Sequence, residues 1–323
     1  MSQLRRNRLT GGWVVYAPER AIRPHGGDPA MRDGRPSLPE RDPDCPFCPG
    51  NEARIPALLY QHDRAAAPGW QIRVIANLYP IIDGIEAPDG DSLVGRHEVI
   101  IEHPRHDMEL AAMDAAEMAA LLDAWRARVA ALWADPETAA VTLFRNRGRA
   151  AGISLDHPHT QILSLGTVPP AMERLERLAD GHRTRHGGCL ACAVLNEEKA
   201  GLRLIDAVPG FFAFVPFAAQ VSCECWIMPE RHEVAFNAIT ATKIEALAAL
   251  LLDVLRRLRD HAGDPQFNLV LHNPSRAADP GSAHWWLRIL PRHKPTGGFE
   301  LGTGVEINAS LPEADAARLR GEG

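Results

Sequence analysis

The sequence predicts an α+β protein in which one unit, made of antiparallel strands and a flanking helix, occurs twice. Its 323 residues are 46% hydrophobic and 24% charged, which suffices to bury a core in one or two domains. Stretches with strand-like composition surround two long helical patterns, one in each half. Each half also carries one C-x-x-C pair. The same features therefore recur in the same order.

The first half starts with a Pro-, Gly- and Asp-rich stretch over residues 24–44, which predicts a loop before the first cysteine pair. We then expect strands at residues 70–77, 97–103, 141–146 and 159–165 and a helix at 114–134. In the second half we expect strands at 211–217, 223–229, 267–273 and 284–291 and a helix at 240–261. The final residues, 311–323, predict a short helix at a subunit contact.

The spacing of distinctive residues supports a tandem duplication. His157 follows His106 by 51 positions, and His284 follows His232 by 52. In each half an asparagine precedes the second histidine by 11 positions, and an Ile-Leu pair follows it at the same offset. Such agreement is improbable by chance, so we infer two copies of one unit around a pseudo-twofold axis.

Each copy carries the ligands of a structural zinc site. Two cysteines and two histidines make the tetrahedral Cys2His2 set, which leaves no position for water. The alternative is a set of buried thiols, or a redox pair, beside unrelated histidines, and the duplicated spacing favours the metal. The predicted zinc ligands are Cys45, Cys48, His106 and His157 in the first half and Cys189, Cys192, His232 and His284 in the second.

The two copies differ two positions after the last ligand. The first has His159 followed by Gln161, and the second has Trp286 followed by Arg288. Alternating strand residues share a face, so His157, His159 and Gln161 should project together. His159 could be a strand histidine or a further ligand, but His157 already completes the Cys2His2 set. We therefore predict that His159 attacks phosphorus and that Gln161 stabilises the phosphoryl oxygens.

The segment "RNRGRAAGIS" just upstream predicts further contacts. Asn146 and Ser154 carry polar side chains, and the two glycines, including Gly152, allow the backbone to approach a ligand closely. We expect these residues to contact phosphate or sugar. A glycine-rich loop by itself would be weak evidence.

The motifs "CPFCPGNE", "FRNRGRAAGIS", "HPHTQI" and "GFELGTGVEIN" resemble the galactose-1-phosphate uridylyltransferase family of the histidine-triad superfamily. The resemblance covers nearly the whole chain. It implies a histidine-triad-like domain at residues 1–168 with the catalytic histidine and a zinc site. A second such domain, at 169–323, would have a degenerate catalytic position and a second zinc site. It further implies a homodimer and ping-pong transfer through a nucleotidyl-histidine.

The resemblance also assigns roles to individual residues. It implies that His159 is the nucleophile, that Gln161 and Ser154 contact its phosphate, that Asn77 and Asn146 line the nucleotide site, and that Arg20 and Arg23 contact phosphate. The reaction it implies is transfer between a nucleoside-diphosphate sugar and a sugar 1-phosphate, as in a UDP-glucose:hexose-1-phosphate uridylyltransferase.

Three departures concern the substrate. The chain has Asn77-Leu78 where galactose 1-phosphate users show Asn-Asp, "HWW" where they show H-W-H, and no lysine in "GGFELGTG". The loop "GGFELGTG" resembles the branch that includes ADP-glucose phosphorylase, and the second Cys2His2 set also fits that branch. The alternatives are therefore an NDP-sugar phosphorylase or adenylyltransferase, a histidine-triad hydrolase, or a zinc-stabilised protein without catalysis.

Charge and hydropathy exclude other classes of partner. The net charge is −6 and the pI about 6.2, so no basic surface for nucleic acid is expected. The N-terminus lacks an apolar signal core, and charges interrupt the most apolar stretch. We expect a soluble, cytoplasmic protein without membrane contact.

Overall fold

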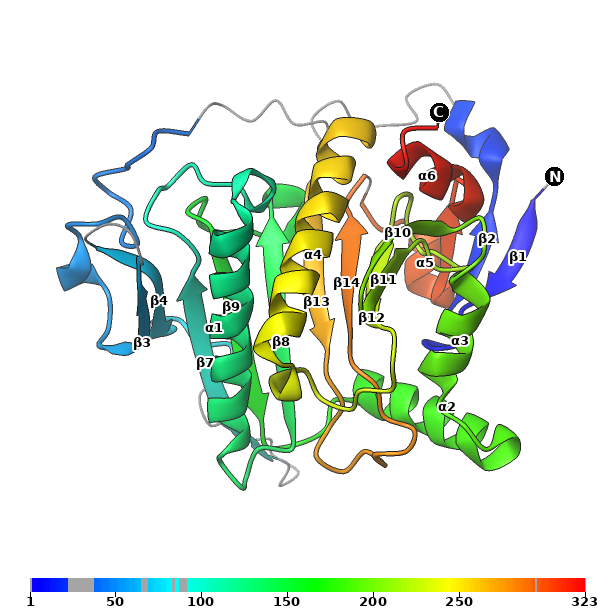
Figure 1. The fold of residues 1–323 in the computed structure, drawn as a ribbon, viewed down its shortest axis with the longest axis horizontal. Helices are drawn as coiled ribbons and strands as arrows, with labels where there is room; N and C mark the ends of the chain where they lie inside the picture. Colours follow the sequence, from blue (N-terminus) through cyan, green and yellow to red (C-terminus); the bar gives the residue numbers. More distant parts are fainter. Residues whose placement is uncertain are drawn as a thin grey trace.

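The computed structural model describes residues 2–22, 38–64, 69–82, 85–86, 92–293 and 295–322. Its main strands are β3 (Leu58–Asp63), β4 (Trp70–Ala76), β7 (Gly95–Ile101), β8 (Ala140–Arg147), β9 (His159–Leu165), β10 (Leu204–Val208), β11 (Phe211–Phe214), β12 (Cys225–Pro229), β13 (Phe267–His272) and β14 (Trp286–Pro291). They form one ten-stranded sheet in the order β3-β4-β7-β9-β8-β13-β14-β12-β11-β10 (Figure 1). All neighbouring strands in it are antiparallel.

The two halves of the sheet repeat one another. Read inward from each edge, β3-β4-β7-β9-β8 matches β10-β11-β12-β14-β13. The halves meet where β8 pairs with β13, with Leu143 opposite Leu271 and Phe144 opposite Val270. In the repeat, Leu143 is equivalent to Val270 and Phe144 to Leu271. A twofold axis between β8 and β13 therefore exchanges the pair Leu143–Leu271 with the pair Val270–Phe144. The predicted α+β class and tandem duplication are confirmed, while the domain boundary at residue 168 stays a prediction.

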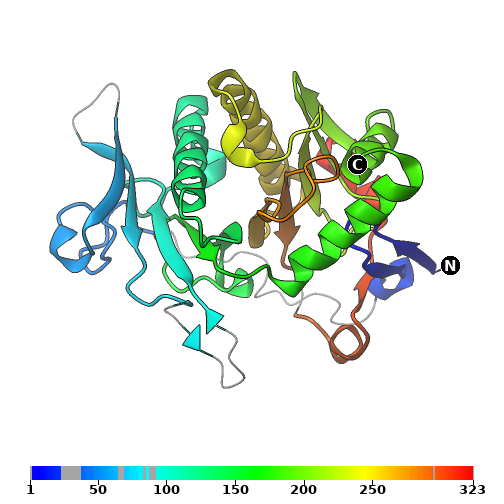
Figure 2. The same ribbon diagram turned by 90° about the horizontal axis from the view of Figure 1, so that it is seen from below.

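Two long helices cover one face of the sheet. α1 (Ala115–Trp133) and α4 (Ala241–His261) lie side by side in front of the sheet in Figure 1 and on the same side of it in Figure 2. α1 starts in a capping box, in which Glu117 N donates to Asp114 at 2.8 Å and Asp114 N donates to Glu117 at 3.0 Å. Thr240 caps α4. Both helices match the predicted ranges to within one residue at each end.

The strands present opposite faces to the helices and to the candidate site. Ile100, Leu143 and Ile162 are fully buried in the same apolar cluster as the inner residues of α1 and α4. Val99 and Ile101, on either side of Ile100 in β7, belong to a separate cluster, because successive side chains of a strand point to opposite faces of the sheet. We call the face away from α1 and α4 the site face.

In the second half two further helices cover the site face. α2 (Pro170–His186) and α3 (Leu190–Glu198) pack Leu175 and Leu178 near Trp226, Met228 and Trp286. Neither helix was expected from the sequence. α2 has no fully buried residue, and charged residues outnumber its few large apolar ones.

The N-terminal strands lie against the C-terminal half. β1 (Gln3–Arg6), β2 (Trp13–Tyr16) and β15 (Val305–Asn308) form a three-stranded sheet near α5 (Gly298–Thr303) and α6 (Pro312–Leu319), while β5 (Ile85–Glu86) pairs with β6 (Ser92–Leu93). The Tyr16 hydroxyl donates to the backbone oxygen of Ala219 at 2.9 Å. α6 is the short helix expected near the end of the chain. In the described residues no helix is long and apolar enough to cross a membrane.

Candidate functional site

Four predicted ligands of the first half converge on one buried point. The Cys Sγ and His ring nitrogen atoms of Cys45, Cys48, His106 and His157 all lie within 4.8 Å of one another. Cys48 Sγ is 3.7 Å from His106 Nδ1 and 3.6 Å from His157 Nδ1. A tetrahedral ion with bonds of roughly 2.0–2.3 Å needs sulfur–nitrogen separations of this size. The donor set therefore fits a zinc ion.

The protein also fixes which nitrogen of His157 faces this cluster. His157 Nε2 donates to the backbone oxygen of His103 at 2.8 Å, so its Nδ1 carries the lone pair. A hydrogen bond from the remote ring nitrogen is the usual support of a histidine ligand. His157 is fully buried and lies just before β9, in a bend rather than in the strand.

The second cluster repeats this geometry nearer the surface. Cys192 Sγ lies 3.7 Å from His232 Nδ1 and 3.6 Å from His284 Nδ1, and Cys189 Sγ lies 3.7 Å from His284 Nδ1. His232 Nε2 donates to the backbone oxygen of Pro280 at 2.8 Å. Cys192 lies in the first turn of α3, whereas the first pair lies in a loop. Both Cys/His clusters can therefore hold a metal ion.

Phe47, between the two cysteines of the first pair, connects that cluster to the sheet. Its ring contacts the His157 ring at a centroid distance of 5.9 Å and the His159 ring at 5.8 Å, edge-on in both cases. His159 belongs to neither Cys/His cluster of the described residues. Its imidazole therefore lies beside the first cluster without being one of its ligands.

His159 is held in one tautomer at the start of β9. Its Nδ1 lies 2.8 Å from the backbone oxygen of His157, and since a carbonyl only accepts, Nδ1 carries the proton. The lone pair is then on Nε2. Burial lowers the pKa of His159, because the interior disfavours the charged form. At neutral pH the site thus contains an uncharged imidazole with a nucleophilic nitrogen.

Gln161 follows on the same face of β9 and is half-buried. Its Oε1 lies 2.9 Å from His97 Nε2 on the neighbouring strand β7. Asn77, after β4, also reaches this histidine, with its Nδ2 3.2 Å from both ring nitrogens. The structure thus brings Asn77 and Gln161 together through His97. No sequence motif marks His97, because one histidine in an alternating strand forms none.

Asn146 lies where the two halves of the sheet join. It stands opposite Asn268 of β13, whose Nδ2 donates to Asn146 Oδ1 at 2.7 Å and to the backbone oxygen of Ala151 at 2.8 Å. Arg292 in turn donates to Asn268 Oδ1. The second half therefore supplies side chains that orient a residue of the first, and no sequence pattern marks either Asn268 or Arg292.

The glycine-rich loop turns back toward Asn146. Gly152 has a φ of 88° at the end of a 3-10 turn, and its backbone oxygen lies 3.5 Å from Asn146 Nδ2. A Cβ atom at Gly148 would lie 2.3 Å from Gln266 Oε1, so only glycine lets the loop pass this close to Gln266, the residue before β13. Ser154 is exposed on the following segment. No contact among the described residues joins it to His159 or Gln161.

The arginines expected at the phosphate lie elsewhere or outside the described residues. Arg20 is exposed in the 3-10 helix Pro18–Ile22, which follows β2. In Figure 1 this segment is at the C-terminal side of the molecule, next to α6 and far from β9. The structure of one chain therefore does not bring Arg20 to His159. Arg23 falls outside the described residues.

A buried ion pair lies beneath the nucleophile, on the helix side. Arg145 Nε donates to both carboxylate oxygens of Glu102 at 3.0 Å, and the hydroxyl of Thr160 donates to Glu102 at 2.6 Å. The side chains of Glu102 and Arg145 are 0% and 4% exposed. This network anchors the residue next to His159 and so fixes the start of β9.

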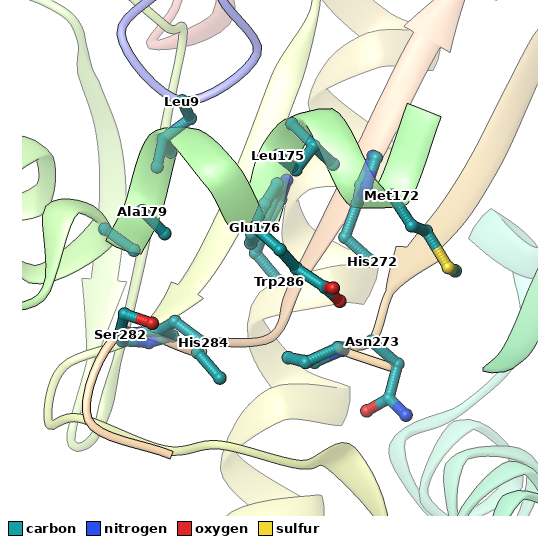
Figure 3. Close-up of a pocket in the computed structure, with 13 residues that line it drawn as sticks. Leu9, Met172, Leu175, Glu176, Ala179, His272, Asn273, Ser282, His284 and Trp286 are labelled. Atoms are coloured by element: carbon teal, nitrogen blue, oxygen red, sulfur yellow. The ribbon is translucent and has the colours of Figure 1, made fainter. Parts of the chain in front are cut away.

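The equivalent position in the second half is closed. Trp286 stands where the first half has His159, and its ring stacks on His272 at 4.6 Å with an interplanar angle of 14°. It lines an apolar pocket that Met172 and Leu175 of α2 cover (Figure 3). Burial lowers the pKa of His272 to about 3. This copy therefore offers no nucleophilic imidazole at the equivalent strand position.

Comparison with known proteins gives a consistent match along the chain. Residues 89–169 match the family model of galactose-1-phosphate uridyl transferase, N-terminal domain. The chain is 32% identical to an ADP-glucose phosphorylase of Arabidopsis thaliana, over 98% of this chain and 92% of the relative. It is 32% identical to a galactose-1-phosphate uridylyltransferase of Cryptococcus neoformans, over 97% and 88%.

Solved structures support the same relation. A crystal structure of an ADP-glucose phosphorylase from Arabidopsis thaliana with bound ADP-glucose superposes with a TM-score of 0.85 at 29% identity, covering 99% of this chain and 98% of that one. A uridylyltransferase structure has a TM-score of 0.76 at 25% identity, covering 100% and 98%. The likeness spans both halves of the sheet.

Proposed function

The chain is a nucleotidyltransferase of the galactose-1-phosphate uridylyltransferase family, and we propose that it works through a covalent nucleotidyl-His159 intermediate. The observation that supports this is the state of His159. Its Nδ1 proton is held by the backbone oxygen of His157, no hydrogen bond from the described residues occupies its Nε2, and burial favours the neutral ring. It is also excluded from the metal cluster beside it. These are the properties that a histidine nucleophile needs.

In the first step Nε2 attacks the α-phosphorus of a nucleoside-diphosphate sugar. A P–N bond forms, the bond from the α-phosphorus to the bridging oxygen breaks, and the sugar 1-phosphate leaves with that electron pair. The imidazole gains positive charge, which the carbonyl of His157 stabilises through Nδ1–H. In the second step a phosphate oxygen of the acceptor attacks the same phosphorus. The P–N bond then breaks and the neutral imidazole is restored.

Amide and backbone groups would stabilise the phosphoryl oxygens during both steps. The oxygen of Gln161 is occupied by His97, and no described residue accepts from its NH2 group, which can donate to the substrate. We assign further contacts to Asn146, Gly152 and Ser154, and contacts with the nucleoside to Asn77. Arg20 and Arg23 are also assigned to phosphate, and Arg20 requires a second subunit to bring it to His159.

Zinc is the metal we propose for both Cys/His clusters. Cys45, Cys48, His106 and His157 would hold one ion, and Cys189, Cys192, His232 and His284 the other. With four protein ligands each ion would serve as a structural crosslink. The first would also hold the loop of Phe47 against the His159 ring.

We further propose that the chain forms a homodimer and resides in the cytoplasm. Large apolar side chains are exposed within one short segment, with Leu78 at 55%, Tyr79 at 87% and Ile81 at 60%, and contiguous exposed apolar surface often marks an interface. All six cysteines are unpaired, as is usual in a reducing compartment. Light scattering in solution gives the mass: twice the chain mass supports the dimer, and a monomer contradicts it.

The donor we propose is UDP-glucose or a related UDP-hexose, with a sugar 1-phosphate as acceptor. ADP-glucose is the second candidate donor, with phosphate as acceptor. It is supported by Leu78 after Asn77 and by the TM-score of 0.85 to the ADP-glucose phosphorylase, against 0.76 to the uridylyltransferase.

Isotope exchange tests the covalent step. With the correct NDP-glucose, labelled glucose 1-phosphate should enter the NDP-glucose pool without a second acceptor, because the first step is reversible. A direct displacement gives no such exchange. A hydrolase instead releases mononucleotide steadily. Comparing UDP-glucose with ADP-glucose in this assay identifies the nucleobase.

A further inference from the structure

His97 lies on the site face between two residues already assigned to the substrate. It occupies β7 opposite Leu163 of β9, and its side chain is among the buried polar groups, with 5% of the residue exposed. The side chains of Asn77 and Gln161 both contact its ring. Nothing in the nucleotidyl-transfer steps above requires the imidazole to touch the substrate. The imidazole instead contacts Asn77 and Gln161, which we assign to substrate binding.

The hydrogen bonds around His97 determine its tautomer. The backbone N–H of Ile81 donates to His97 Nδ1 at 3.1 Å, so Nδ1 is an acceptor and carries no proton. Burial also lowers the pKa of His97, which favours the neutral ring. The proton must then be on Nε2, which lies 2.9 Å from Gln161 Oε1. His97 therefore donates to the oxygen of the Gln161 amide.

This contact fixes which end of Gln161 faces the reaction. An amide has one acceptor and one donor end. Because His97 occupies the oxygen, the NH2 group is the end left for a phosphoryl group on His159. Turned the other way, the amide would present its oxygen to phosphoryl oxygens and would repel them. A flip would also set the NH2 group against the Nε2 proton of His97.

We propose that His97 is a positioning residue, which holds the Gln161 amide in the orientation that donates to the transferred phosphoryl group. The inference rests on the proposed function, because it presupposes a phosphoryl group on His159. His97 acts through Gln161 and does not touch the reacting atoms.

Backbone contacts indicate that the nucleoside side of the site does not depend on the imidazole. Asn77 N donates to the backbone oxygen of His97 at 2.8 Å, and Asn77 Oδ1 accepts from Tyr79 N at 2.9 Å. Both bonds survive a change of side chain at position 97. Loss of the imidazole should therefore slow the chemical step and leave donor binding largely unchanged.

Two substitutions that differ by one methylene group test the assignment. In His97→Gln the amide nitrogen can reach the position of Nε2, so the donor to Gln161 is kept. In His97→Asn the amide reaches only the position of Nδ1, so that donor is lost. We expect the rate of nucleotidyl-enzyme formation to fall roughly ten- to hundredfold in His97→Asn, as when a preorganised donor is disturbed. The donor KM should change little, and His97→Gln should recover most of the rate.

The double variant His97→Asn/Gln161→Ala identifies the route of the effect. If His97 acts through Gln161, the double variant is no slower than Gln161→Ala alone. His182→Asn on α2 makes the same change away from the site and should leave the rate unaltered. Thermal unfolding of each variant separates a folding defect from a slow reaction.

The outcomes distinguish this inference from the function on which it rests. If the wild type forms the adduct and His97→Asn forms it equally fast, the inference on His97 is overturned and the proposed function stands. The inference on His97 is also overturned if the double variant is slower than Gln161→Ala by the full factor that His97→Asn alone loses. If the wild type forms no adduct with any NDP-sugar, both fall together. If His97→Asn does not fold, His97→Gln is compared with the wild type. A large loss of rate in folded His97→Gln contradicts the assignment, because this variant keeps the donor to Gln161.

Discussion

His159 donates a hydrogen bond from Nδ1 to the backbone oxygen of His157, 2.8 Å away. The imidazole of His157 meanwhile points its own Nδ1 into the first Cys/His cluster. One short segment therefore joins the metal cluster to the nucleophile, and the backbone of a ligand fixes the tautomer of the next histidine. Among the described residues, the Nε2 atom of His159 has no hydrogen-bond partner, as the proposed attack on phosphorus requires.

The rate of nucleotidyl-enzyme formation should depend on pH through His159. Burial lowers its pKa in the folded protein below the ordinary value of about 6.5, and only the neutral ring can attack. We expect a constant rate above about pH 6.5 and a fall below it, with a midpoint under 6.5. The unfolded chain binds this proton more tightly, so stability also declines as the pH drops through this window. Single-turnover rates from pH 4.5 to 8 measure the midpoint, and a midpoint above 6.5 contradicts the burial argument.

Metal analysis should separate the two Cys/His clusters. We expect about two zinc ions per chain in the wild type and about one in Cys48→Ala or Cys192→Ala, because each variant breaks one tetrahedral set. Cys48→Ala should also slow transfer, since its cluster adjoins Phe47 and His159. Cys192→Ala should lower the melting temperature with a smaller effect on transfer. Cys225→Ala, a thiol outside both clusters, is the control for cysteine loss. Unchanged zinc content in Cys48→Ala would rule out the first site.

Breaking the buried ion pair beneath β9 should destabilise the fold. Glu102→Ala leaves Arg145 charged and unpaired, at a cost of about 3–5 kcal/mol in the free energy of unfolding. The exposed pair of Arg177 and Glu173 on α2 provides the control. Glu173→Ala should cost no more than about 0.5 kcal/mol. Urea unfolding of both variants gives the comparison, and equal losses would show that burial of the pair has no effect.

Asn268 belongs to the second half, but we expect it to affect the rate of the reaction at the first. Asn268→Ala removes the donors to Asn146 and to the oxygen of Ala151. We expect kcat/KM to fall roughly three- to tenfold, less than the ~100-fold typical of losing a direct donor. Asn196→Ala, exposed on α3, should leave kcat/KM unchanged. An Asn268→Ala enzyme with wild-type kinetics would exclude a role for this junction.

Much of the fold could be predicted because helices, strands and Cys/His sets each leave a local pattern in the sequence. The helix expected at 114–134 begins at Asp114 since the sequence itself contains the capping box with Glu117. The Cys/His sets could be grouped because the two copies repeat their spacing. The continuous sheet could not be foreseen, since the pairing of β8 with β13 depends on two strand edges that have no sequence signature.

The same limit applies to the site. Gln161 and His159 stand out in a motif, but the residues that orient them come from other strands. His97 and Asn268 become visible only when β7 and β13 are placed beside β9 and β8. Arg20 was expected at the phosphate, and a single chain does not bring it there. Composition and spacing therefore do not predict contacts between segments that lie far apart in the sequence.

The most direct test of the central claim is the intact mass of the protein after incubation with UDP-glucose or ADP-glucose. We predict an increase by one UMP or one AMP in the wild type, lost on addition of the sugar 1-phosphate or phosphate acceptor. The increase should be absent in His159→Ala, although that variant keeps its zinc and its melting temperature. An adduct of unchanged yield in His159→Ala, or no adduct in a wild type that turns over, would contradict the account.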